Sequence, residues 1–297
     1  MKKVLLVGSG LRVQSGIVPA LWCLRDEFEI TAVYSRSIKD LSFCDGQLKV
    51  TTVNSLLKVD FKSLDLIMVA VTLSEVPNVL RALSQFETRH IALMLDTPVL
   101  DFKNLFAAKL FRRFKKVLAS EDTIALPPFV SARTLIDSGK IGKLKNIYFF
   151  HNGYKYHALA SLKTLTNSRI KFLRSRKFSG KLMQKDISFK NDVRAVLYEP
   201  REYTRGKFLI EGDKGIVADY DFKNSVKRVY QIGYKIENGI YRGLTLDGQE
   251  LELNDLDKKY LSNISENIFD KSNEHHENSR PYGFDNFCGF RKSKICL

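Results

Sequence analysis

The chain has 297 residues, a length that suits two domains better than one. With 44% hydrophobic and 27% charged residues it has an ordinary globular composition, which excludes a disordered or fibrous chain. The formal net charge of +15 would attract polyanions. No zinc-finger spacing and no RNP-like aromatic pattern accompanies this charge, so specific nucleic-acid binding is not expected.

Neither a targeting signal nor a membrane span is expected. The basic and apolar opening is too short for a signal peptide, because Gly8, Ser9 and Gly10 follow it directly. No apolar run approaches the roughly 18 residues of a spanning helix. Neither disulfide nor metal-ligand spacing relates the four cysteines, Cys23, Cys44, Cys288 and Cys296. We therefore expect a cytoplasmic protein in a reducing compartment, with no membrane partner.

The first 122 residues alternate apolar strands with helical stretches, which predicts a parallel, doubly wound α/β sheet. The expected strands are 3–7, 28–34, 50–52, 64–72, 90–95 and 116–120. The expected helices are 17–25, 76–86 and 102–114, the last one basic and amphipathic. Residues 1–122 should therefore form a Rossmann domain, whose ligands bind at the C-terminal ends of the strands.

Residues 123–297 have a different pattern, which predicts an α+β domain. A helix is expected at 127–139 and a strand at 145–152. After residue 187, β-branched and aromatic segments separated by turn residues predict a mostly antiparallel sheet. A last helix is expected at 256–269, and the polar stretch 270–280 is expected to be a loop.

Two segments are strongly basic. Between residues 163 and 185 there are eight cations and no acidic residue: Lys163, Arg169, Lys171, Arg174, Arg176, Lys177, Lys181 and Lys185. This segment forms either a solvated face or a site for an anionic substrate. The second cluster consists of Lys109, Arg112, Arg113, Lys115 and Lys116. Its helical spacing spreads the charges around the surface, which favours simple solvation.

A glycine-rich turn follows the first strand directly. Gly8 suits the tight turn of a dinucleotide-binding motif, and Gly10 would let the backbone approach a pyrophosphate at the helix N-terminus. The third glycine position is Val13, with Gly16 three residues later, so the fingerprint is incomplete. The expected cofactor contacts here are Gly8, Ser9, Gly10, Leu11, Arg12 and Val13. The alternative is a structural turn without a ligand.

The end of the second strand bears on the type of dinucleotide. An NAD site usually has Asp or Glu there for the ribose 2′-hydroxyl, whereas this chain has Ser35 and Arg36. The absence of a carboxylate and the presence of a guanidinium favour NADP, with NAD as the alternative. Arg36 could also be an ordinary surface residue.

Several loose motifs follow one another over residues 1–220. They are the glycine turn with Pro19-Ala20-Leu21, the strand 65–72, the strand end Leu95-Asp96-Thr97-Pro98, the helix end 135–143 and the stretch 205–215. Their order and spacing resemble the Gfo/Idh/MocA oxidoreductase family, named after glucose–fructose oxidoreductase and inositol dehydrogenase. The resemblance implies further cofactor contacts at Val71, Thr72, Asp96, Thr97 and Pro98. It also implies a dimer or tetramer formed through the sheet domain.

The resemblance implies catalytic residues as well. Members of that family use a Lys from Glu-Lys-Pro and a downstream Asp and His to polarise a carbonyl and transfer its proton. In this chain the Lys position is Thr97, the Asp position is approximately Gly153, and His157 is retained.

The candidate catalytic residues are therefore His157 and its neighbours Tyr154, Lys155 and Tyr156, any of which could act as the acid. A histidine in an apolar helix is also often a purely structural residue. His275 and His276 lie in a polar stretch without metal-ligand spacing, so no metal site is expected.

The leading hypothesis is an NAD(P)-dependent oxidoreductase that acts on a sugar-like substrate. The positive charge would suit a nucleotide-sugar or a phosphosugar. The alternative is a dinucleotide-binding sensor or regulatory protein without redox turnover, and the loss of the family's Lys and Asp favours it.

Overall fold

The computed structural model describes residues 1–43, 46, 48–121, 123–153, 155–201, 206–237 and 240–251. These residues belong to two compact units, one containing Met1–Glu121 and the other residues 123–251. The expected helix 256–269, the loop 270–280, Tyr154, Cys44, Cys288, Cys296, His275 and His276 lie outside the described residues. No helix among the described residues is long and apolar enough to span a membrane.

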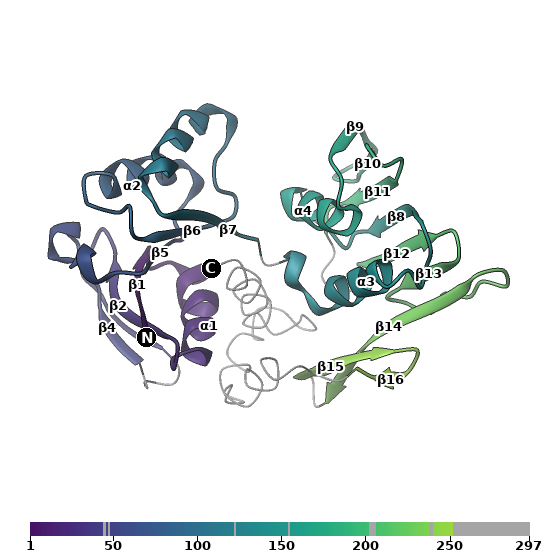
Figure 1. The fold of residues 1–297 in the computed structure, drawn as a ribbon, viewed down its shortest axis with the longest axis horizontal. Coiled ribbons are helices and arrows are strands. Elements are labelled where there is room, and N and C mark those ends of the chain that lie inside the picture. The colour runs from purple at the N-terminus through teal and green to yellow at the C-terminus, as the bar shows by residue number, and fades with distance from the viewer. Residues whose placement is uncertain are drawn as a thin grey trace. The chain divides into compact units, whose positions relative to one another are not determined.

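The first unit is built on a five-stranded parallel sheet with the order β2-β1-β5-β6-β7 (Figure 1). Its strands are β1 (Lys2–Val7), β2 (Phe28–Tyr34), β5 (Leu66–Val69), β6 (Ala92–Asp96) and β7 (Lys116–Ser120). All four neighbouring pairs are parallel, which confirms the predicted doubly wound sheet. The order reverses between β1 and β5, and ligands of such sheets bind at this point.

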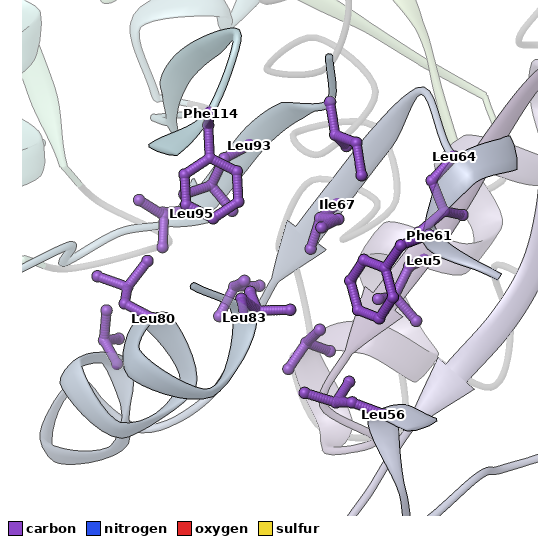
Figure 2. Packing of buried hydrophobic residues seen from close by; sticks show 14 of the residues in the cluster. Leu5, Leu56, Phe61, Leu64, Ile67, Leu80, Leu83, Leu93, Leu95 and Phe114 are labelled. Carbon is purple, nitrogen blue, oxygen red and sulfur yellow. The ribbon is translucent and has the colours of Figure 1, made fainter. Parts of the chain in front are cut away.

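Apolar side chains cover both faces of this sheet, as parallel sheets require. On one face Leu5, Ile67 and Leu93 belong to one buried cluster with Leu80 and Leu83 of α2 (Val76–Leu83), as Figure 2 shows. Three 3-10 helices contribute buried residues to the same core: η2 (Leu56–Lys58), η3 (Phe61–Ser63) and η5 (Phe102–Arg113). A further 3-10 helix, η4 (Leu73–Glu75), precedes α2. The alternate side chains Val4 and Leu6 are equally buried on the other face.

The helix after the glycine turn differs from the expected 17–25. The segment is π-helical over η1 (Val13–Ile17) and α-helical over α1 (Val18–Cys23). Val13 and Gly16 are buried on the side that packs against the sheet.

Two further expectations for the first unit are wrong in detail. The expected strand 50–52 is β4 (Leu48–Thr51), which pairs with β3 (Asp40–Phe43) in a separate hairpin. Among the β-pairings of the described residues, an isolated β-bridge between Tyr34 and Val53 connects the chain after this hairpin to the end of β2. The expected amphipathic helix 102–114 is η5, which has 3-10 and not α-helical geometry.

The second unit contains a nine-stranded sheet in the order β16-β15-β14-β13-β12-β8-β11-β10-β9. Its strands are β8 (Leu144–Phe150), β9 (Ile170–Lys177), β10 (Met183–Phe189), β11 (Arg194–Glu199), β12 (Lys207–Gly212), β13 (Gly215–Ala218), β14 (Arg228–Glu237), β15 (Ile240–Leu246) and β16 (Gln249–Glu250). Only the β8–β11 and β13–β14 pairs are parallel. The predicted mostly antiparallel sheet, and with it the fold class, is confirmed.

Two helices cover one face of this sheet. After the short η6 (Thr123–Ala125), α3 (Pro127–Asp137) places Phe129 against Phe149 and Phe208, with ring centroids 5.5 Å away in both cases. α4 (Lys155–Thr166) contributes the buried Leu162 and Leu165. Strand β9 was not predicted. It contains much of the basic segment 163–185, and every one of its residues is exposed at the edge of the sheet.

Candidate functional site

The glycine turn in the first unit has a backbone that only glycine accommodates at one position. Gly8 has φ +119°, and a Cβ on it would lie 2.2 Å from the carbonyl oxygen of Ala70, at the end of β5. Gly8 N–H donates to Tyr34 O at 2.9 Å, and Ala70 N–H donates to Val7 O at 2.9 Å. The turn is therefore clamped between the C-terminal ends of β2 and β5.

Gly10 is in the opposite situation, because a Cβ on it would meet no atom within 4 Å. Its carbonyl accepts hydrogen bonds from Val13 N and Gln14 N at 3.0 and 3.1 Å, which begins the helix. The N–H groups of a helix's first turn have no partner within the helix, and together with the helix dipole they favour an anion. Open space above Gly10 thus coincides with a local preference for negative charge.

Other predicted cofactor residues gather around this turn. The Ser9 and Ser35 hydroxyls are 2.8 Å apart, which joins the turn to the end of β2. Arg12 donates to both carboxylate oxygens of Asp96, at the end of β6, with distances of 3.0 to 3.2 Å. Both members of this ion pair are mostly buried. The structure therefore brings together residues 84 positions apart in the sequence.

The remaining predicted contacts lie at the same edge of the sheet. Val71 follows β5 and is within 3.5 Å of a Cβ built on Gly8, while Thr72 precedes η4. Thr97 Oγ1 donates to Ser120 O at 3.3 Å, and the Thr97-Pro98 peptide bond is cis. Leu11 and Arg36 are exposed.

The second unit contains a small pocket that sequence reasoning did not fully identify. It is lined by Thr123, Leu126, Phe129, Asn152, Gly153, His157, Ala158, Ser161 and Arg201. His157, one of the predicted catalytic residues, belongs to this lining. Asn152 and Arg201 were not predicted, because no sequence pattern relates them to His157 before β8, β11 and α4 are brought together.

His157 lies in the first turn of α4. Ser161 Oγ donates to His157 O at 3.0 Å, and the Tyr156 and His157 ring centroids are 4.2 Å apart. Lys155 has φ +42°, and its backbone N–H donates to Glu199 Oε1 at 2.6 Å. The side chain of Lys155 is exposed, and neither Lys155 nor Tyr156 belongs to the pocket lining.

Two buried acidic residues, Glu199 and Asp219, support the pocket through separate contacts. Glu199 forms an ion pair with Lys185 at 2.7 Å, and only about a tenth of each side chain is exposed. Asp219, also buried, accepts from Phe208 N at 2.6 Å and from Asn152 Nδ2 at 3.4 Å. Burial and the nearby Asp219 raise the pKa of Tyr220 above its ordinary value. These contacts fix the positions of Asn152 and of the start of α4.

Packing leaves no room for a side chain at Gly153, the position to which the sequence resemblance approximately assigns an Asp. A Cβ at Gly153 would lie 2.4 Å from Ala158 Cβ and 3.1 Å from the Phe149 ring. A larger residue would therefore force α4 away from β8. Among the described residues, no group of three His, Cys, Asp or Glu side chains could hold a metal ion.

Comparison with known proteins identifies similar folds but no close relative. No family model and no curated sequence matches the chain. An oxidoreductase from Thermotoga maritima aligns with a TM-score of 0.60 at 15% identity, covering 100% of this chain and 96% of the other. For myo-inositol 2-dehydrogenase from Lactobacillus plantarum the TM-score is 0.57 at 12% identity, with coverage of 99% and 96%.

A third similar structure is that of a protein named as a repressor and not as an oxidoreductase. A super-repressor mutant of Gal80p from Saccharomyces cerevisiae aligns with a TM-score of 0.63 at 13% identity, covering 99% of this chain and 95% of the other. At identities this low the likeness establishes the fold alone. It agrees with the fold class predicted from the sequence, a doubly wound parallel sheet followed by an α+β part with a mostly antiparallel sheet.

Proposed function

We propose that this chain, which has the two-domain fold of the Gfo/Idh/MocA oxidoreductases, is an NADP-dependent oxidoreductase for an anionic, sugar-like substrate. The glycine turn carries the proposal. Gly8 brings the backbone against β5, and Gly10 leaves the space at the helix N-terminus open for a pyrophosphate.

The preference for NADP rests on the end of β2. The Ser35 hydroxyl is next to Ser9, and the exposed Arg36 follows it, so no carboxylate repels a 2′-phosphate there. The Arg12–Asp96 ion pair holds the start of the helix against β6. Because Asp96 already neutralises Arg12, this arginine contributes mainly to the shape of the site.

The pocket of the second unit provides the groups for the substrate. A nicotinamide dinucleotide held by Gly8, Ser9 and Gly10 of the glycine turn would supply the hydride-transfer chemistry. His157 transfers the proton of the substrate oxygen, since an imidazole ring can both donate and accept a proton. Arg201 pairs with a phosphate or carboxylate of the substrate, and Asn152 contributes an amide to its hydroxyl groups.

Binding of the two cofactors tests the proposal directly. Nicotinamide fluorescence should show tighter binding of NADPH than of NADH. Arg36→Asp should weaken NADPH binding at least about tenfold, because it replaces a charge-assisted contact by repulsion. Arg89→Asp, the same charge change at an exposed site of the first unit, should leave the affinity unchanged. If neither cofactor binds, the glycine turn is purely structural and the proposal is wrong.

A dinucleotide-binding regulator without turnover is the second candidate. Two observations favour it: Thr97, bonded to Ser120 O, cannot replace a lysine, and Gly153 has no room for a carboxylate. The similarity to a Gal80p super-repressor mutant is compatible with such a role. NADPH binding without NADPH oxidation across sugar phosphates, nucleotide-sugars and sugar acids would favour the regulator.

A further inference from the structure

The 3-10 helix η5 presents an unusual surface in the first unit, between β6 and β7 (Figure 1). Phe102 is 94% exposed, Leu105 53% and Phe106 55%. Lys103, Lys109 and Arg112 are exposed beside them. We call these six residues the η5 surface. Three large apolar side chains in contact with water on one short element cost solvation free energy, which a partner would recover.

The 3-10 geometry is what assembles this surface. With three residues per turn, side chains at positions i and i+3 lie in line. Lys103, Phe106, Lys109 and Arg112 therefore form one row along the helix, and all four are exposed. α-helical spacing would have distributed these residues around the surface, which is why the sequence predicted only solvated charge.

The inner side of η5 holds the surface in place. Ala107 is fully buried and Phe114 is 7% exposed, both within the core of the first unit. Asp101 Oδ1 accepts from Asn104 N at 2.9 Å at the start of the helix. Near its end, Thr88 Oγ1 donates to Arg113 O at 2.9 Å. The exposed apolar residues are thus presented by a supported element.

The charge around the surface has one sign. Residues 102–120 contain six cations and no acidic residue: Lys103, Lys109, Arg112, Arg113, Lys115 and Lys116. None of the ion pairs given for the described part of the chain involves one of them. Their positive potential is therefore available to an anionic partner.

From this arrangement we propose that the η5 surface binds the protein peripherally to a bilayer containing anionic lipids. Apolar side chains flanked by Lys and Arg are the composition of interfacial membrane-binding segments. A nucleic acid would satisfy the cations and could stack on phenylalanine, but it offers no apolar environment for Leu105. A bilayer takes up both the charges and all three apolar side chains. No membrane partner was expected from the sequence, because the row of exposed residues depends on the 3-10 geometry of η5.

Vesicle sedimentation tests this proposal with the full chain. At moderate ionic strength the protein should bind vesicles of equal parts phosphatidylglycerol and phosphatidylcholine, and should not bind pure phosphatidylcholine. Phe102→Ser/Phe106→Ser should weaken binding about tenfold or more by removing the inserted apolar area. Lys109→Glu/Arg112→Glu should weaken vesicle binding by a similar factor.

Matched controls separate a local site from general charge. Lys171→Glu/Arg174→Glu makes the same charge change on the exposed strand β9, and Leu57→Ser/Val226→Ser removes two other exposed apolar side chains. Both control variants should bind vesicles like the wild type. The proposal is overturned if no vesicle binds, if the β9 control loses binding equally, or if the phenylalanine variant binds normally. All variants should keep the wild-type NADPH affinity, so this result is independent of the proposed enzymatic function.

Discussion

Replacing Gly8 by alanine would add one methyl group at the most constrained point of the glycine turn. The new Cβ would lie 2.2 Å from Ala70 O and 3.1 Å from Ala70 C, whereas ordinary contacts begin at 3.4 Å. The Ala70 backbone cannot yield easily, because its N–H is bonded to Val7 O in the centre of the sheet. In addition, φ +119° is a conformation that L-residues rarely adopt.

The cost has two parts that can be estimated separately. The unfavourable backbone conformation costs about 1–3 kcal/mol. Forcing a methyl group into a packed site costs another 1–3 kcal/mol or so. Gly8→Ala should therefore lower the free energy of unfolding by roughly 2–6 kcal/mol, a large part of the 5–15 kcal/mol typical of a domain. The denaturation midpoint of the first unit should fall accordingly.

Gly10→Ala is the matched control, since its Cβ meets nothing within 4 Å. It should change the free energy of unfolding by less than about 1 kcal/mol. NADPH binding should nevertheless weaken about tenfold or more, because the methyl group occupies the place where the pyrophosphate meets the backbone. Urea denaturation and NADPH titration of both variants measure the two effects. Wild-type stability of Gly8→Ala would refute the packing argument, and unchanged NADPH affinity of Gly10→Ala would refute the cofactor site.

Two further variants address the second unit. His157→Ala should leave NADPH affinity nearly unchanged and reduce turnover of a substrate found by screening about 100-fold or more; unchanged turnover would exclude proton transfer by His157. Hydrogen bonds from Lys227 and Asn146 lower the pKa of Glu211 below its usual 4.5. The Lys227–Glu211 pair therefore stabilises the fold above that pH, and this stabilisation is lost as Glu211 becomes protonated at lower pH. Lys227→Met should therefore cost about 1 kcal/mol at pH 7, with a difference from wild type that shrinks in urea denaturation below pH 4.5; a pH-independent difference would contradict the assignment.

Much of the first unit followed from local patterns. Strands 28–34 and 116–120 agree with β2 and β7 at both ends, because short apolar runs bounded by turn residues suffice to define the strands of such a sheet. The glycine turn was recognisable for the same local reason: Gly8 directly follows such a strand. The edge of the sheet at which ligands of this fold bind could therefore be predicted from the sequence alone.

The hairpin β3–β4, the edge strand β9 and the 3-10 geometry of η5 could not be predicted. A four-residue strand such as β4 does not reveal whether it will join the main sheet or pair with β3. β9 is exposed on both sides, so it has no alternation of buried and exposed residues to identify it. Ala107 is the one buried residue given for η5, so the sequence offers no repeat of buried positions from which to tell the helical period, and only the packed structure selects it.

By itself, the sequence determined the doubly wound sheet, the antiparallel second sheet and the residues around the glycine turn, because each depends on neighbours along the chain. The tertiary structure decided the rest. It paired Arg12 with Asp96 and placed Arg201 in the lining of the same pocket as His157. It also left no room for a carboxylate at Gly153. The first two outcomes bring together residues tens of positions apart, and all three depend on how the elements of the fold pack together, which no local pattern records.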